Sequence, residues 1–279
     1  MARIESLSML LDPTGKDFLQ ELYGAVIENV QKGTISNIIK NTNLSGDPKS
    51  GSVEAKRFAN STMQDYGTAR GKGKGENVKA KPVTIQIDKD KEIVEEIEQK
   101  DIMLYGVDGL LQRRSANHAK TLIRELERAF FTEANTAGTA VTTTATDIED
   151  VVEALIQQVE TTKNDYVDGV DRDMLSVVCT TKFYGDMRNY LDKDTNNANV
   201  NTAAEGFGTF HGVRVWPSVY LPATVKAICQ ADGSVALPVL PRPYTAQQIP
   251  LSEAYAVMLF FYYGVKAVTP DLIAKLSAA

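Results

Sequence analysis

The sequence contains only two cysteines, Cys179 and Cys229, in a chain of 279 residues. Small extracellular scaffolds held together by disulfides carry many more, so a disulfide framework is excluded. Each cysteine ends an apolar run, "MLSVVC" and "VKAIC", and such runs are typical of buried strands. We therefore expect both thiols to be buried, reduced and unpaired, acting as small apolar side chains.

The chain also lacks a long apolar run. The longest, "AYAVMLFFYYGV" at 254–265, is too short to span a bilayer. Its aromatic and β-branched residues predict a buried strand instead. The first residues, "MARIESLSMLLDPTGKDF", include early acidic residues and only a short apolar stretch, unlike a signal peptide. We expect no membrane segment and a cytosolic site of synthesis.

Histidine is equally scarce, with His118 and His211 as the only two. Polar residues surround His118 in a predicted helix, so we expect it on a solvated face; His211 is expected to have a structural role in a turn. No Ser–His–Asp or Cys–His set has a local signature, and no metal-ligand spacing is present. The acidic segment at 164–173 lacks the order of a calcium loop and predicts a solvated turn. The sequence thus predicts a protein that is not an enzyme and has no catalytic residue, metal or cofactor.

A tract rich in glycine and basic residues, "YGTARGKGKGEN", occupies 66–77. It does not fit a phosphate-binding loop, because Gly73 and Gly75 follow Lys72 and Lys74 where that motif requires Ser or Thr. A strand, not a helix, is predicted after it, so no helix N-terminus would face the phosphate. The dinucleotide pattern fails as well, because Glu76 stands where its last glycine should be.

Strands are predicted on both sides of this tract, which places it at the tip of a long two-stranded loop. On the downstream side, Val83, Ile85 and Ile87 alternate with polar residues. An isolated ribbon of two strands is only marginally stable. We therefore expect this loop, and the apolar residues of segment 1–45, to be stabilised by packing on neighbouring copies. The residues predicted to contact a neighbouring copy are Arg70, Gly71, Lys72, Gly73, Lys74 and Gly75, with the glycines supplying positive φ angles at the tip.

The charge distribution suggests how such a contact could form. The net charge of −6 argues against a dedicated nucleic-acid-binding protein. Basic residues are in excess over 40–82 and acidic residues over 88–101, so the tip of one copy could lie near the acidic base of the next. Two alternatives stay open. The lysines could merely solvate a flexible loop, or Arg70, Lys72 and Lys74 could bind a polynucleotide.

The rest of the chain predicts an α+β protein with an extended half, 1 to about 140, and a compact half. A long helix is expected over 107–136, where an apolar stripe has helical spacing. The stripe comprises Leu110, Leu111, Ala119, Leu122, Ile123, Leu126, Ala129 and Phe130. The compact half is predicted to contain helices near 148–159 and 180–191 and several strands. Asp232-Gly233 signals a hairpin there.

The order of these parts resembles the major capsid proteins of tailed bacteriophages with the Hong Kong 97-type fold. The segments with the strongest local resemblance are "LIRELERAFFTEANTAG", "GTFHGVRVWPSVYLP" and "FFYYGVKAVTPDLI". The resemblance implies five parts. They are an N-terminal arm (1–51), an extended loop or E-loop (52–88), a peripheral (P) domain with a long spine helix (89–140), an axial (A) domain (141–255) and a C-terminal return (256–279).

This resemblance implies a major capsid protein that assembles with itself, as hexamers and pentamers, into an icosahedral shell around double-stranded DNA. It implies A-domain contacts at five- and six-fold positions, P-domain contacts at three-fold positions, and an extended loop that reaches over an adjacent subunit. Expected partners are a scaffolding protein, a portal and decoration proteins, and DNA bound without sequence specificity. A long N-terminal extension of the kind that serves some members of the family as a built-in scaffold is not recognised. We therefore expect either that a separate scaffolding protein is used, or that such a segment is absent from this chain. The expected location is the virion, and the host cytoplasm during assembly. The alternative within the same fold is an encapsulin-like protein nanocompartment.

Overall fold

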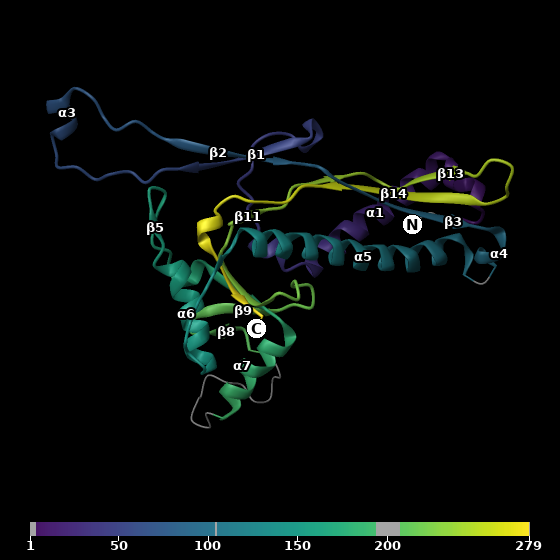
Figure 1. Cartoon of the computed structure of the whole chain (residues 1–279). Coiled ribbons are helices and arrows are strands. Elements are labelled where there is room, and N and C mark those ends of the chain that lie inside the picture. The colour runs from purple at the N-terminus through teal and green to yellow at the C-terminus, as the bar shows by residue number, and fades with distance from the viewer. Residues whose placement is uncertain (1–3, 104, 194–206, 279) are drawn as a thin grey trace.

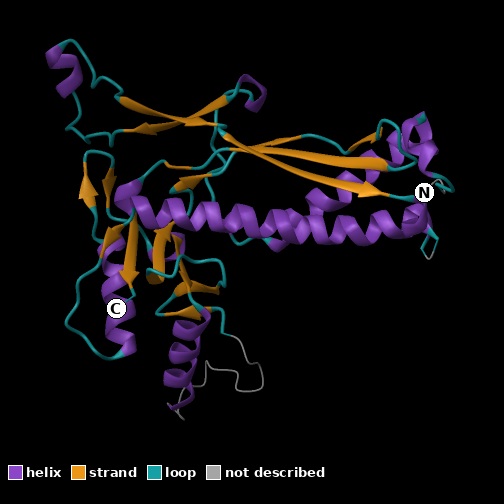
Figure 2. Ribbon diagram, turned by 45° about the vertical axis from the view of Figure 1, so that its right-hand side comes forward, coloured by secondary structure: helices purple, strands orange, loops and turns teal. Residues whose placement is uncertain are grey.

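The computed structural model describes residues 4–103, 105–193 and 207–278. A long helix, α5 (Gly106–Ala137), runs along the molecule beneath a sheet, and a compact lobe lies at its C-terminal end (Figures 1 and 2). A thin loop projects away from both (Figure 1). None of the helices in the described ranges is long and apolar enough to cross a membrane.

The spine helix α5 forms where its apolar stripe predicts it. Leu111, Leu122, Leu126 and Phe130 are all buried in the largest core cluster. Their i, i+4 and i+11 spacing keeps them on one face of the helix. The predicted helix at 107–136 is confirmed to within one residue at each end.

The N-terminal segment packs on this same spine. It consists of the 3-10 turn η1 (Leu7–Leu11), helix α1 (Pro13–Gly33) and the short helix α2 (Ser36–Ile39). The apolar face of α1 is buried in the core that contains the α5 stripe, through Phe18, Leu19, Leu22, Val26 and Val30. The expectation that these residues need neighbouring copies is therefore wrong, since they find their partners within the chain.

A sheet lies above the spine helix in the view of Figure 2. Its central strand β14 (Tyr255–Tyr263) pairs antiparallel with β3 (Lys89–Ile97) on one edge, and with β12 (Val239–Pro241) and β13 (Thr245–Gln248) on the other. Alternate residues of β14, among them Val257, Leu259 and Phe261, are buried against α5, as strand periodicity requires. The late aromatic run is thus a strand, as predicted from its composition.

The compact lobe is built on a six-stranded sheet of order β4-β16-β10-β7-β9-β8. The strands are β4 (Thr139–Ala140), β7 (Leu175–Cys179), β8 (Thr209–Phe210), β9 (Val213–Pro217), β10 (Val225–Ala231) and β16 (Ile273–Ser277). Helices α6 (Ile148–Glu160) and α7 (Thr181–Lys193) contribute apolar side chains to the core of this sheet. Cys179 and Cys229 lie on adjacent strands, fully buried and unpaired, so that prediction is confirmed.

The predicted hairpin at Asp232-Gly233 is wrong, although a turn with φ of 84° at Gly233 is present. The strand after the turn, β11 (Val235–Ala236), pairs with β15 (Lys266–Ala267) and not with β10. Strand β10 already pairs with β16 on one edge and β7 on the other, and the turn contacts the N-terminal segment instead, where Ile39 O accepts from Gly233 N at 2.8 Å. Asn41 Nδ2 also donates to Gly233 O at 2.8 Å, which holds the turn away from a hairpin.

The extended loop has a two-stranded root. After the turn η2 (Pro48–Ser50), strand β1 (Ser52–Phe58) pairs antiparallel with β2 (Ala80–Gln86). Strands therefore lie on both sides of the glycine-rich tract, as predicted, but their ladder ends at Phe58 and Ala80, before the tract begins. The intervening chain carries one short helix, α3 (Thr68–Lys72), at the end farthest from the spine (Figure 1).

Short elements complete the chain. They are α4 (Gln99–Ile102), the hairpin of β5 (Lys163–Asn164) and β6 (Val167–Asp168), η3 (Arg172–Met174) and η4 (Pro270–Leu272). The acidic segment at 164–173 forms part of this hairpin and the turn after it. The β5–β6 hairpin rises from the lobe toward the extended loop (Figure 1).

Candidate functional site

All six tip residues predicted to make a contact, 70–75, are exposed. Arg70, Lys72 and Lys74 form no ion pair with any residue that the structure describes. Their side chains therefore present positive charge to solvent at the far end of the loop.

The glycines of the tip have different roles from those predicted. Gly73 has φ of 67° and ends helix α3, while Gly67, with φ of 92°, begins it. Both positions require a left-handed conformation that favours glycine. Gly71 lies inside the helix and Gly75 beyond it, and neither has a positive φ. Only Gly73 of the three predicted glycines therefore has the expected conformational role, and Gly67 was missed.

The loop also exposes large apolar side chains that sequence reasoning missed. Met63 and Tyr66 are each 98% exposed, Val78 is 85% exposed and Phe58 is 56% exposed. Exposed apolar groups that gather on one projecting segment are typical of an interaction surface. The signal was present in the sequence, since Tyr66 and Met63 lie in a polar stretch that offers them nothing to pack against.

The root of the loop is fixed to the body by a small apolar cluster. Val53, Ala55 and Ile85 pack with Ala236 and Val268. Lys266 Nζ also donates to Thr84 O at 3.0 Å. At Gly264 a Cβ would lie 2.1 Å from Gln86 O, so only glycine allows the end of β2 to pass this close. The loop is therefore rigidly mounted at its root and unpacked at its tip.

The acidic segment at 88–101 divides between two faces of strand β3. Glu95 faces α5, where Arg114 Nε lies 2.9 Å from both of its oxygens. Hydrogen bonding from Arg114 lowers the pKa of Glu95, against the opposing effect of burial, with a further contribution from His118. Asp90, Glu92 and Glu96 point the other way, are exposed, and form no ion pair within the described ranges.

These three carboxylates border half-exposed apolar residues of the neighbouring strand. In the register of β3 and β14, Tyr262 lies opposite Asp90, Phe260 opposite Glu92 and Met258 opposite Val94. We call this surface the outer sheet face, defined by residues Asp90, Glu92, Val94, Glu96, Met258, Phe260 and Tyr262. The outer sheet face combines negative charge with apolar area. The extended loop combines positive charge with apolar area, so the two surfaces are complementary.

His118 is not on a solvated face, as the sequence predicted, but is 4% exposed. Its Nδ1 lies 2.7 Å from Tyr244 Oη, and its Nε2 lies 3.2 Å from Glu95 Oε2. Strand β3 and the segment before β13 cover this part of α5, which is why polar neighbours in sequence misled the prediction. Burial raises the pKa of Tyr244 well above its usual range, so the phenol stays protonated and cannot act as a nucleophile. The chain of carboxylate, imidazole and phenol is thus a buried structural network.

His211 lies in the turn between β8 and β9 with φ of 50°. Its Nδ1 is 2.7 Å from Glu153 Oε2, and its ring stacks on Phe210. Glu153 also accepts hydrogen bonds from Arg172, which, with smaller effects of other groups and against burial, lowers its pKa to about 2. This arrangement links α6 to the turn, and it offers no nucleophile for the histidine to activate.

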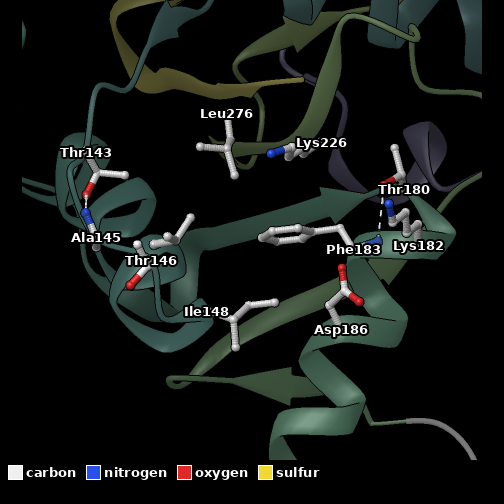
Figure 3. A pocket seen from close by; sticks show the side chains of 11 residues that line it. Thr143, Ala145, Thr146, Ile148, Thr180, Lys182, Phe183, Asp186, Lys226 and Leu276 are labelled. Carbon is white, nitrogen blue, oxygen red and sulfur yellow. Dashed lines mark hydrogen bonds between the residues drawn. The ribbon is translucent and has the colours of Figure 1, made fainter. Parts of the chain in front are cut away.

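An open groove on the lobe lies between α7, the start of α6, the start of β10 and the end of β16 (Figure 3). Lys182, Asp186 and Lys226 line it together with the apolar side chains of Phe183 and Leu276 (Figure 3). It contains no cysteine or histidine and no pairing of a nucleophile with a base. Among the residues that the structure describes, no group of three or more His, Cys, Asp or Glu is placed to hold a metal ion.

Comparison with known proteins gives no match in sequence and clear matches in structure. No family model matches the chain, and no curated protein sequence matches it. A structure from Mycobacterium phage Che8 has a TM-score of 0.62 at 18% identity, covering 81% of this chain and 84% of that chain. The capsid structure of the cyanophage P-SCSP1u has a TM-score of 0.62 at 12% identity, covering 86% and 85%.

A virus-like particle from Pyrococcus furiosus has a TM-score of 0.58 at 13% identity, covering 93% of this chain and 99% of that chain. These three matches cover between 81% and 93% of this chain. The chain therefore has the α+β Hong Kong 97-type capsid fold that the sequence resemblance implied.

Proposed function

We propose that this chain, which has a phage capsid fold, is a major capsid protein that assembles with itself into an icosahedral shell around the double-stranded DNA of a tailed phage. The observation that carries the proposal is the extended loop. It projects from the body with unpaired positive charge and exposed apolar side chains that no described part of the chain covers. Such a surface is useful only when a partner covers it.

The partner that fits the loop best is the outer sheet face of an adjacent copy. Arg70, Lys72 and Lys74 would approach the carboxylates of Asp90, Glu92 and Glu96. Each exposed ion pair would contribute only about 0–1 kcal/mol, but the contact repeats at every subunit. Complementary charge also sets the register and the rate of approach.

Apolar contacts would supply most of the free energy of this docking. Met63 and Tyr66 on the loop would cover Met258 and Phe260, which are half-exposed in the single chain. Burial of apolar surface contributes about 25 cal/mol per Å². The contact thus combines a non-directional attraction with a charge pattern that specifies one orientation.

We propose the parts of the chain by analogy with the capsid fold. The N-terminal arm (1–51), extended loop (52–88), P domain (89–140), A domain (141–255) and C-terminal return (256–279) are proposed as the units of the lattice. We further propose hexamers and pentamers as its building blocks, a virion location with assembly in the host cytoplasm, and a structural rather than enzymatic role. A scaffolding protein, a portal and decoration proteins are the proposed partners.

A second candidate function is a nanocompartment that encloses protein instead of DNA. The match to the virus-like particle from Pyrococcus furiosus, which covers 99% of that chain, favours it. The two candidates share the shell and differ in its content. Polynucleotide binding through the basic tip is a weaker candidate, because the net charge is −6 and the basic residues are carried on a thin loop (Figure 1).

Electron microscopy of the purified chain tests the proposal. We expect closed particles of uniform diameter in negative stain, either from the chain alone or after co-expression with a scaffolding protein. Particles that take up double-stranded DNA through a portal would support the phage capsid, and particles that co-purify with one folded protein would support the nanocompartment. A chain that stays monomeric under all these conditions, or that binds DNA in a salt-dependent way without forming shells, would contradict the proposal.

A further inference from the structure

Three segments that are distant in sequence meet where the extended loop leaves the body. Arg57, at the end of β1, donates from Nη1 to Asp271 Oδ1 at 2.7 Å. Its Nη2 donates to Asp271 Oδ2, which completes a two-point pair. Asp271 belongs to η4 and also accepts from Asn164 Nδ2 of the β5–β6 hairpin at 2.5 Å. The guanidinium carbon lies 4.6 Å from the centre of the Tyr166 ring. We call this group of four residues the loop latch.

The loop latch is well shielded from solvent compared with the other ion pairs near the loop. The Arg57 side chain is 12% exposed and the Asp271 side chain 27% exposed. Two-point pairs between a guanidinium and a carboxylate fix orientation as well as distance. A ring stacked on the guanidinium restrains the direction of the pair further. The contact therefore fixes an angle between the loop and the lobe.

Beyond Arg57 the loop makes a further hydrogen bond to the body. Asn60 N donates to Asp165 O of the hairpin at 2.9 Å. Past Asn60, the hydrogen bonds of the described chain join one side of the loop to the other, for example Thr62 N to Glu76 Oε2 at 3.0 Å. The latch and the adjoining Asn60 contact are thus the last attachments to the body before the tip.

We propose that Arg57 is a positioning residue for shell assembly. Through the loop latch it fixes the direction in which the extended loop leaves its own subunit, and so sets the angle between that subunit and the neighbour on which the tip docks. This inference rests on the proposed function. Arg57 contacts Asp271 and Tyr166 of its own chain, and Asn164 binds Asp271 there. The effect of Arg57 is seen in the contact between two subunits.

Because the tip lies far from the latch, a small change in the angle at the latch moves the tip by several ångströms. An extended chain advances about 3.3 Å per residue, so the tip at Arg70, ten residues on, lies at most about 33 Å beyond Asn60. A tilt of about 10° at the latch would move a tip at that distance by about 6 Å. A displacement of this size would separate the charged side chains of the tip from the carboxylates of the outer sheet face.

The latch is separate from the cluster that holds the loop's root. The latch is formed by polar and aromatic side chains, whereas the cluster at the root consists of apolar side chains such as Val53 and Ile85. Loss of the latch should therefore leave the body folded and the strands of the root paired, and only the direction of the loop should become variable.

The test measures loop direction in unassembled subunits and shell geometry in assembled ones. Spin labels are attached at Ser61→Cys, just past the latch, and at Asp150→Cys on α6, and their distance distribution is recorded by pulsed electron paramagnetic resonance. In the otherwise unchanged chain we expect one narrow distance peak and shells of a single diameter. With Arg57→Ala or Asp271→Asn we expect loss of the narrow peak and shells of mixed diameter or open sheets.

Two further variants separate positioning from general effects. Lys56→Ala removes the same charge from the adjacent exposed position and should behave like the unchanged chain in both measurements. Arg57→Lys keeps the charge but cannot form the two-point pair, so it should broaden the peak, and it substitutes for Arg57→Ala if that variant does not fold. Urea unfolding of each variant shows whether the subunit remains folded.

A narrow peak in both Arg57 variants would overturn the proposal, and so would a broad peak together with shells of the normal single diameter. If the unchanged chain forms no shells at all, the proposed function fails. The distance measurement on subunits still decides whether Arg57 fixes the direction of the loop.

Discussion

At the scale of single residues, Glu127 is the most unusual side chain of the core. It is 1% exposed on the spine helix. Its Oε1 accepts from Ser36 N at 2.8 Å and from Ser36 Oγ at 2.6 Å. Its Oε2 has no partner in the described structure. Burial raises the pKa of Glu127, and the hydrogen bonds from Ser36 only partly oppose that effect.

Because the pKa is raised, the folded chain binds this proton more tightly than the unfolded chain. The free energy of unfolding should therefore rise as the pH falls through the raised pKa toward the ordinary value of 4.5. Glu127→Gln keeps the acceptor for Ser36 and cannot titrate. We expect the difference in unfolding free energy between the unchanged chain and this variant to shift in favour of the unchanged chain as the pH is lowered.

Urea titrations of unassembled subunits at several pH values measure this shift. Glu153→Gln is the control of opposite sign, since the pKa of Glu153 is lowered to about 2. The ionised Glu153 carboxylate stabilises the folded chain above pH 4.5, and this stabilisation should be lost as the pH falls from 4.5 toward 2. A pH-independent difference for Glu127→Gln would contradict the account of Glu127.

The two histidines should differ sharply in their effect on stability. His118→Ala leaves Tyr244 Oη short of a buried partner, while Glu95 keeps Arg114, and an unsatisfied buried polar group costs about 1–3 kcal/mol. We expect a loss of about 2–4 kcal/mol from this group and the cavity together. His211→Ala removes a partly exposed pair and should cost less than about 1 kcal/mol. Equal losses in urea unfolding would show that His118 is not part of a stabilising network.

At the scale of elements, the spine helix is the part that the sequence predicts best. Its stripe identifies both its extent and its buried face, but not the helix that packs against it. His118 follows Leu111 by seven positions and precedes Leu122 by four, so helical spacing places it on the stripe. That spacing was the signal that could have predicted its burial, and it was outweighed by polar neighbours in sequence, which lie on other faces of the helix.

Truncation of the stripe should unfold the subunit. Leu122 and Leu126 are 3% and 4% exposed, and removal of a buried leucine side chain to Ala costs about 2–5 kcal/mol. We expect Leu122→Ala with Leu126→Ala to give insoluble or unassembled protein. Leu110→Ala with Ile123→Ala, at half-buried positions of the same helix, should be milder. Normal particles from the first pair would mean that the stripe does not support the core.

The extended loop is predictable as a projecting ribbon, but not in its details. Gly67 and Gly73 bound a short helix because both adopt left-handed conformations, and composition alone does not say which glycines of the tract will do so. The anchoring of the loop by Arg57 joins residues that are more than 200 positions apart in the chain. Such a contact leaves no local pattern in the sequence.

Reversal of charge at the tip should impair assembly but not folding. With Lys72→Glu and Lys74→Glu the tip would face Asp90, Glu92 and Glu96 of the neighbour with like charge. We expect folded subunits that assemble poorly, with partial recovery at high salt, because ions screen exposed charges beyond about 10 Å at 0.1 M. Sedimentation at low and high salt measures this.

A charge swap makes this test specific. Addition of Glu92→Lys and Glu96→Lys to the tip variant should restore assembly if the outer sheet face is the docking site. Lys16→Glu with Lys49→Glu changes the net charge equally, away from the loop tip, and serves as the control. If the tip variant assembles normally at both salt concentrations, the basic side chains only solvate the loop.

At the scale of the whole molecule, the fold class and the order of parts could be predicted, and the partners of each part could not. Residues Phe18 and Leu22 were expected to need other copies, yet they pack on α5 within the chain. Conversely, Met63 and Tyr66 stay exposed in the single chain. Apolar content shows that a segment must be covered, but only the folded chain shows whether it covers itself. That distinction separates the core of the subunit from the surfaces that we assign to assembly.

The most direct test of the account is a cryo-electron microscopy reconstruction of the assembled particle at side-chain resolution. We predict a closed shell in which the tip of each extended loop, Arg70 to Lys74, lies on the outer sheet face of an adjacent copy, within ion-pair distance of Asp90, Glu92 or Glu96. The Arg57–Asp271 pair should be intact within each subunit. A shell in which the tips extend into solvent, or in which the outer sheet face is bare, would contradict the account.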